Sequence, residues 1–167
     1  NITYINYMKY EVKLHIYDIS NGWMRRISPI LMCRRIKGLW HTGICIYDRE
    51  YYYGGGIQKD DSEYIEDMVG KPVEVLSLGF TEVDESIFEE FLNSIKGKYD
   101  YSNYNLFTQN CNHFTNEAIE FLTGSGIPQH IVNLPDVCSS TFVGKLVKIF
   151  LEKLELIGKR IDGLNDD

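Results

Sequence analysis

The two halves of the chain carry different hydrophobic periodicities, and this contrast restricts the fold more than any other feature of the sequence. In the first half, apolar residues alternate with polar ones or form short runs rich in β-branched and aromatic residues, which is typical of strands. We expect four strands there, at residues 9–16, 39–47, 51–53 and 73–78. Together they predict a small, mainly antiparallel sheet.

The second half of the chain has apolar residues at the spacing of amphipathic helices. We expect three helices, at residues 84–96, 111–122 and 140–157. A short segment at residues 130–133 is expected between the last two. Asn110 suits the N-cap of the second helix, and Gly124 suits its C-terminal end. Strands followed by helices predict an α+β fold.

The chain has 167 residues and neither an internal repeat nor a low-complexity linker, which is typical of one compact domain. We expect that domain to cover residues 8–158, with flexible ends at residues 1–7 and 159–167.

The net charge of −7 argues against nucleic acid as a partner, because phosphate binding needs clustered cations. The charge is unevenly spread: residues 1–40 hold seven Lys and Arg against two Asp and Glu, whereas residues 41–167 hold ten against 22. Basic and apolar residues mix at residues 25–37, where a solvated loop is the commoner interpretation and an anionic or membrane surface the alternative. No apolar run is long enough to cross a bilayer, so membrane contact is not expected.

The cysteine and histidine spacing does not predict a structural metal or any other cofactor. The four cysteines form no C-x-x-C pair, and the spacing of Cys111 and His113 fits neither a zinc finger nor a helical i, i+4 chelate. The N-terminus lacks the pattern of a signal peptide. We therefore expect reduced thiols and a cytoplasmic or nuclear location.

Cys111 and His41 stand out as a candidate catalytic pair. A cysteine in the first turn of a helix faces unpaired N–H groups and the helix dipole, which can lower its pKa and favour the nucleophilic thiolate. His41 opens a predicted strand and is a natural base, although a histidine bonded within the sheet is the commoner case. A helix-start cysteine facing a strand-borne histidine is the arrangement of papain. The other cysteines are expected to pack as small apolar residues: Cys33, Cys45 and Cys138.

Four blocks of the sequence carry a resemblance to a known family. They are, in chain order, RRISPILMCRRIKGLWHTGI, YYYGGGI, YNLFTQNCNHFTNEAIEFLTGSGIP and LPDV. In this order they resemble the PPPDE peptidase family, and within it the deSUMOylating isopeptidases. The most specific pieces lie at residues 40–42, 54–56 and 110–116, and the likeness runs from about residue 10 to residue 146.

This resemblance implies a circularly permuted papain-like cysteine peptidase fold, in which the histidine precedes the cysteine. It assigns Cys111 as nucleophile and His41 as general base and then general acid. It also implies a homodimer and a reaction on conjugates of a ubiquitin-like modifier, SUMO or ubiquitin, whose isopeptide bond is cleaved. The tail beyond Lys153 departs from the family pattern.

Several further residues are candidates for secondary roles. The oxyanion needs two donors, and we expect the Cys111 N–H to be one and a side-chain amide of Gln109 or Asn110 to be the other. Trp40 is expected either to line the substrate groove or to pack in the core. His113 lies about 200° around the helix from Cys111, which places it outside the site.

Two other functions are compatible with the same residues. Cysteine–histidine chemistry also serves acyl-protein thioesterases and acyltransferases related to lecithin:retinol acyltransferase, and the basic, apolar segment at residues 25–37 would favour a lipidated substrate. A binding module that recognises a modifier without cleaving it is the second alternative, against which the intact pair of Cys111 and His41 argues.

Overall fold

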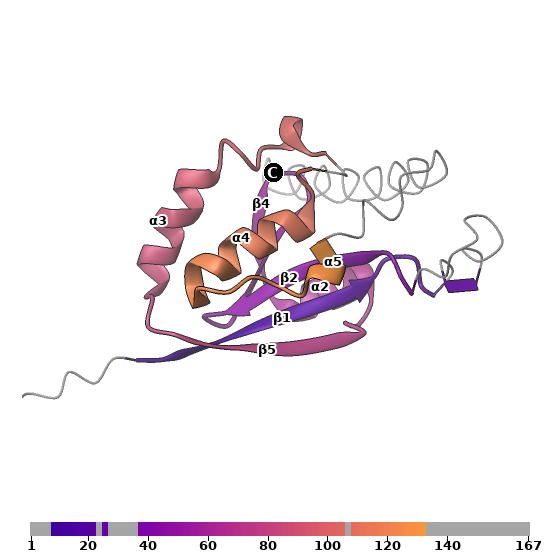
Figure 1. Ribbon diagram of the computed structural model, residues 1–167, viewed down its shortest axis with the longest axis horizontal. Coiled ribbons are helices and arrows are strands. Elements are labelled where there is room, and N and C mark those ends of the chain that lie inside the picture. Colours follow the sequence, from indigo (N-terminus) through magenta and orange to yellow (C-terminus); the bar gives the residue numbers. More distant parts are fainter. Residues whose placement is uncertain (1–7, 23–24, 27–36, 106–107, 133–167) are drawn as a thin grey trace, which may run out of the picture.

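The computed structural model describes residues 8–22, 25–26, 37–105 and 108–132. In this part of the chain, five antiparallel strands form one sheet in the order β4–β3–β2–β1–β5 (Figure 1). The strands are β1 (Tyr10–Asp18), β2 (Trp40–Ile46), β3 (Arg49–Tyr53), β4 (Ile57–Asp60) and β5 (Glu74–Thr81). The small antiparallel sheet expected from the sequence is therefore confirmed.

Helices lie on both faces of this sheet. They are α2 (Ser62–Val69), α3 (Glu85–Ile95), a short 3₁₀ helix (Tyr101–Asn103), α4 (Cys111–Thr123) and α5 (Gln129–Val132). Helix α4 crosses one face in contact with β1, β2, β3 and β5, while α2 lies behind the sheet in the view of Figure 1. Strands with helices packed on them confirm the α+β class.

The alternation of side chains along β1 divides the sheet into two chemically different faces. Val12, Leu14 and Ile16 point into the main core, where they pack with α4. Tyr17 lies on the other face and forms a smaller buried cluster with Tyr52 and with Ile65 of α2. Side chains at odd-numbered positions of β1 and β2 thus point to the face of the sheet that α2 covers.

The glycines that follow β3 make the turn into β4. Gly55 and Gly56 have φ values of 144° and 115°, which residues with a Cβ rarely adopt. This turn places β4 beside β3, with Tyr53 paired to Ile57.

Helix α2, strand β4 and the short 3₁₀ helix were not expected from the sequence. Helix α2 has only eight residues, which is shorter than the window in which helical periodicity is recognised, and only Ile65 is fully buried in it. Strand β4 is a polar edge strand of four residues that lacks alternation. The expected helix at residues 140–157, most of the basic segment at residues 25–37, Cys33 and Cys138 lie outside the described residues.

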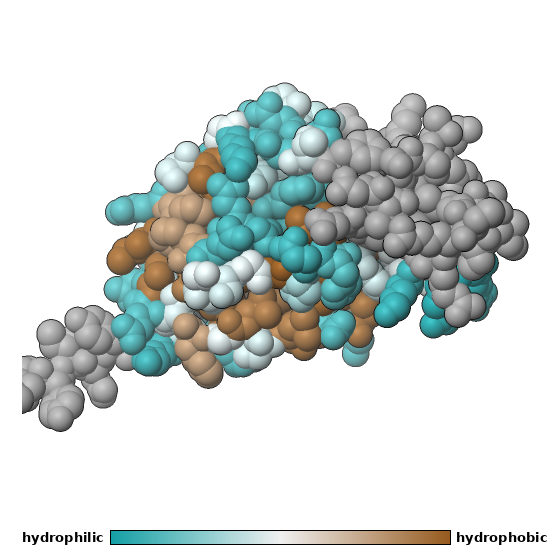
Figure 2. Space-filling view, in the orientation of Figure 1, coloured by the Kyte–Doolittle hydropathy of each residue, from teal (hydrophilic) through white to brown (hydrophobic). Residues whose placement is uncertain are grey.

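The surface in Figure 2 is polar over much of α4 and carries apolar side chains along the border occupied by β5. On and beside this edge strand Val73, Val75 and Phe80 are exposed. Within the described ranges, none of the helices is long and apolar enough to span a membrane.

Candidate active site

Cys111 is the first residue of α4, and the local sequence fixes the start of that helix. The Asn110 side chain accepts hydrogen bonds from the backbone N–H groups of Asn112, at 2.9 Å, and His113, at 3.1 Å. The His113 ring bonds back to the backbone N–H of Asn110, which completes a capping box. The expected N-cap is confirmed, and His113 serves the helix start.

Three hydrogen bonds tie the start of α4 to the start of β2. Asn112 Nδ2 donates to the Trp40 carbonyl at 3.1 Å, and Asn112 Oδ1 accepts from Thr42 Oγ1 at 2.9 Å. Thr115 Oγ1 donates to the Thr42 carbonyl at 3.3 Å. These bonds join segments about 70 residues apart in sequence and hold Cys111 against the strand that carries His41.

The thiol of Cys111 is buried, with 4% of the residue exposed. Burial raises its pKa to about 11, although hydrogen bonds from the backbone of Thr42 and Asn112 and from the Tyr104 side chain lower the pKa in part. The thiol is therefore protonated at neutral pH. The lowered thiol pKa expected from the helix start is not found, because the cost of burying a charge outweighs the stabilisation by the helix start.

His41 is buried on β2, directly after Trp40, and is 2% exposed. Its ring centroid lies 6.1 Å from that of Tyr17 and 6.0 Å from that of Tyr52. Burial lowers the pKa of His41 to about 4, and the negative charge of Glu50 opposes this shift only in part. The imidazole is therefore neutral at pH 7, the form that can accept a proton. The His41 ring thus packs with the Tyr17 cluster on the α2 side of the sheet, whereas the thiol of Cys111 meets the backbone of Thr42, the next residue along the strand, on the α4 side.

Tyr104 is a site residue that the sequence did not single out. Its hydroxyl hydrogen-bonds to the sulfur of Cys111, and burial raises the pKa of the phenol well above its ordinary value. It therefore stays protonated and can donate. Tyr104 lies in an aromatic connector between the 3₁₀ helix and α4, and no spacing rule links a residue in such a loop to the helix that follows.

Of the two amides expected to complete an oxyanion hole, that of Gln109 has another acceptor. Gln109 Nε2 donates to the Lys98 carbonyl, and the Asn110 side-chain oxygen caps α4. Asn112 bonds to β2, while Asn116 donates to Glu120 within α4 at 3.0 Å and accepts from the Ile127 N–H at 3.0 Å.

Trp40 takes the core position that was one of its two expected roles, and lining of the substrate groove stays a prediction. Its side chain packs against the main core and also lines a cavity of about 390 Å³ beside Asp18, Lys37 and Val73.

Comparison with known proteins shows the family of the chain. The family model of the PPPDE putative peptidase domain matches residues 10–151. Desumoylating isopeptidase 1 of Xenopus laevis is 40% identical over 147 residues, which cover 87% of this chain and 86% of that protein. The Homo sapiens protein of the same name is 40% identical over 149 residues, 88% of each chain. A DeSI-like protein of Arabidopsis thaliana is 33% identical over 132 residues, 77% of this chain and 56% of that protein.

Proposed function

The chain belongs to the PPPDE peptidase family, and we propose that it is a cysteine isopeptidase that removes a ubiquitin-like modifier, SUMO or ubiquitin, from protein conjugates. The observation that carries this proposal is the attachment of the Cys111 helix start to the strand segment that contains His41. The names of the relatives from Xenopus laevis and Homo sapiens support SUMO as the first modifier to test. We also propose the permuted papain topology, since the histidine precedes the cysteine here.

The two pKa values favour proton transfer during attack over a preformed ion pair. At neutral pH the proton resides on Cys111 and the His41 imidazole is neutral, so that proton transfer requires the ring to turn from Tyr17 and Tyr52 toward the thiol. His41 removes the thiol proton as the sulfur bonds to the carbonyl carbon of the modifier's last residue. The imidazolium then returns the proton to the lysine amine as the isopeptide C–N bond breaks. Water hydrolyses the resulting thioester and regenerates the thiol.

The oxyanion formed during attack needs donors, and we assign the Cys111 backbone N–H and the Tyr104 hydroxyl to this role. The hydroxyl already lies against the sulfur, and the oxyanion develops on the carbon that this sulfur attacks. Gln109 is less suited than the sequence implies, because its amide nitrogen donates to the Lys98 carbonyl. Each such donor typically lowers the barrier by about 2.7–4 kcal/mol.

A homodimer is part of the proposal. Two features support self-association. Apolar side chains are exposed along the β5 edge, and residues 1–40 are basic whereas residues 41–167 are acidic. A stable interface should bury at least about 1,000 Å² in total.

Substrate profiling tests the function. We expect a full-length modifier joined through its tail to a fluorophore to be cleaved with a kcat/KM at least about 100-fold above that of the tail peptide, a difference of about 2.7 kcal/mol. The folded modifier would supply this binding energy outside the cleft. Equal rates on both substrates, with faster cleavage of long-chain acyl thioesters, would instead establish a thioesterase.

Two variants separate catalysis from binding. His41→Ala should lower kcat/KM by about 10²–10⁴-fold, the usual contribution of a general base, while the exposed His130→Ala should leave it unchanged. Cys111→Ala should bind the modifier and release no fluorophore. Turnover by Cys111→Ala would exclude the cysteine mechanism, and absence of turnover by the wild-type protein despite binding would favour a binding module.

A further inference from the structure

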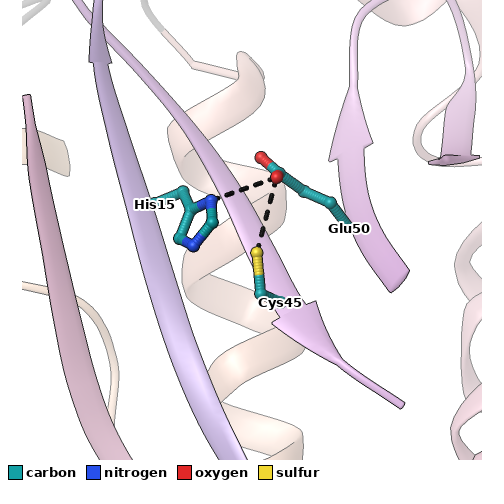
Figure 3. Close-up of side chains that lie close together, drawn as sticks. All are labelled: His15, Cys45 and Glu50. Carbon is teal, nitrogen blue, oxygen red and sulfur yellow. Dashed lines mark hydrogen bonds and ion pairs between the residues drawn. The ribbon is translucent and has the colours of Figure 1, made fainter. Parts of the chain in front are cut away.

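A second cluster of reactive side chains lies on the α2 face of the sheet, apart from Cys111 (Figure 3). It combines His15 of β1, Cys45 of β2 and Glu50 of β3. One ligand atom from each residue lies within 4.8 Å of the other two. Glu50 Oε2 is 3.1 Å from His15 Nδ1 and 3.4 Å from Cys45 Sγ.

The register of the three strands builds this cluster. Cys45 pairs directly with Glu50, and His15 pairs with Gly43 on the other side of β2. A Cβ at Gly43 would collide with the Glu50 carboxylate. The missing side chain therefore leaves the space through which Glu50 crosses β2 to reach His15.

Glu50 is a carboxylate with no exposed surface. The Tyr17 hydroxyl donates to its two oxygens at 2.8 and 3.0 Å. The carboxylate is thus enclosed within the sheet, between the imidazole of His15 and the thiol of Cys45.

We propose that His15, Cys45 and Glu50 form a binding site for one Zn²⁺ ion. Imidazole, thiolate and carboxylate are the usual protein ligands of zinc, and three of them with an open fourth position form a common type of site. Tetrahedral zinc would place Nδ1 and Sγ about 3.4 and 3.6 Å from the carboxylate oxygen. The observed separations of 3.1 and 3.4 Å require shifts of a few tenths of an ångström, and the ligand atoms of His15 and Cys45, which lie within 4.8 Å of each other, must approach to about 3.6 Å.

The charges and protons of the site balance when the zinc ion is bound. Binding displaces the thiol proton of Cys45 to solvent, and the thiolate and the Glu50 carboxylate then balance the two positive charges. Lys13, which pairs with Cys45 in the sheet, is engaged in an ion pair with Glu11 at 3.2 Å.

The site is open to solvent on one side. Cys45 lines a cavity of about 960 Å³ together with Ser62 and Asp61, which lie at the start of α2. Ser62 Oγ is 3.5 Å from Cys45 Sγ, so a fourth ligand would bind between α2 and the sheet. The three ligands are 30 and five residues apart in sequence, and this spacing matches no metal motif.

Cobalt titration of the reduced, metal-free full chain tests the site, because Co²⁺ replaces Zn²⁺ and gives a thiolate charge-transfer absorption. We expect one Co²⁺ per chain, displaced by Zn²⁺. Cys45→Ser should abolish the absorption, and Glu50→Gln should weaken binding by at least about 100-fold, the upper end for loss of an outer-shell partner. Cys111→Ser and a Cys33→Ser/Cys138→Ser double variant should keep the absorption.

Thermal unfolding shows whether each variant is folded and whether Zn²⁺ binds to its native state. Zn²⁺ should raise the Tm of the wild-type protein and of Cys111→Ser, but leave the Tm of Cys45→Ser unchanged, because only a ligand bound to the native state stabilises it. Absence of the absorption in the wild-type protein would overturn the proposal. Retention of the absorption by Cys45→Ser with its loss in Cys111→Ser would also overturn it and place the metal on the catalytic thiol.

Discussion

Cys111 experiences two opposing influences, and their balance determines how the residue reacts. The helix start and the bonds from Thr42 and Tyr104 favour the thiolate, whereas complete burial favours the thiol. Burial prevails and the pKa rises to about 11. With His41 at about 4, the pair rests in its neutral form over the whole range between these values.

Alkylation kinetics test this resting state. Far below the thiol pKa, the thiolate fraction of Cys111 grows about tenfold for each pH unit. The rate of Cys111 modification by iodoacetamide should therefore rise about tenfold per unit from pH 7 to pH 9, as followed by peptide mapping. Cys111→Ser supplies the background from the other three cysteines. A rate that is high and constant over this range would mean a preformed thiolate–imidazolium pair.

Tyr104 gives a second prediction at this scale. Tyr104→Phe removes only the hydroxyl and should lower kcat by about 100–1,000-fold with little change in KM, because the donor acts on charge that develops in the transition state. Tyr101→Phe, at an exposed position in the same segment, should keep wild-type kinetics. If Tyr104→Phe retained activity while Gln109→Ala lost it, the donor would be Gln109.

Among the elements, the contact of α4 with β2 positions the site. Asn112 is 2% exposed and bridges the two, so its removal leaves the Thr42 hydroxyl and the Trp40 carbonyl without that partner. Asn112→Ala should lower the free energy of unfolding by about 2–4 kcal/mol. Activity should fall further than the folded fraction, because Cys111 loses its attachment to the strand.

Denaturant unfolding monitored by circular dichroism, with activity assayed on the folded fraction, measures both effects. Asn93→Ala, at an exposed position of α3, is the matched control and should unfold like the wild-type protein. A change in stability of less than about 0.5 kcal/mol for Asn112→Ala, the usual range for surface substitutions, would show that other contacts hold α4 in place.

The sequence predicted the elements that depend on interactions between neighbouring residues, and it missed contacts between residues far apart in the chain. Strand β1 and helix α4 carry strong periodicities and a helix cap, and both were predicted near their observed bounds. Helix α2 has only eight residues and a single fully buried side chain, Ile65, so its apolar positions are too few to be recognised from the sequence. The partners of Asn112 and the placement of Tyr104 depend on tertiary contacts, which local spacing does not encode.

The same limit applies to the charges in the site. The sequence predicts that Cys111 begins a helix, but its pKa depends on burial by residues from β2 and the connector before α4. The cluster of His15, Cys45 and Glu50 likewise exists only because β1, β2 and β3 pair in one register.

For the whole molecule, the proposal predicts self-association. Sedimentation at tens of micromolar should give a dimer, and higher salt should shift it toward monomer if the basic and acidic regions meet across the interface. A monomer at this concentration in low salt would contradict the homodimer, and a dimer insensitive to salt would assign the contact to apolar surface such as the β5 edge.

The central claim is that Cys111 attacks the C-terminal carbonyl of a ubiquitin-like modifier. The most direct measurement uses full-length SUMO whose C-terminal carboxylate is replaced by a thiol-reactive electrophile, followed by peptide mapping of the product. The account predicts one modifier per chain, bonded to Cys111, and no product with Cys111→Ser. A bond to Cys45, or a folded wild-type protein that forms no product with either SUMO or ubiquitin carrying this group, would contradict it.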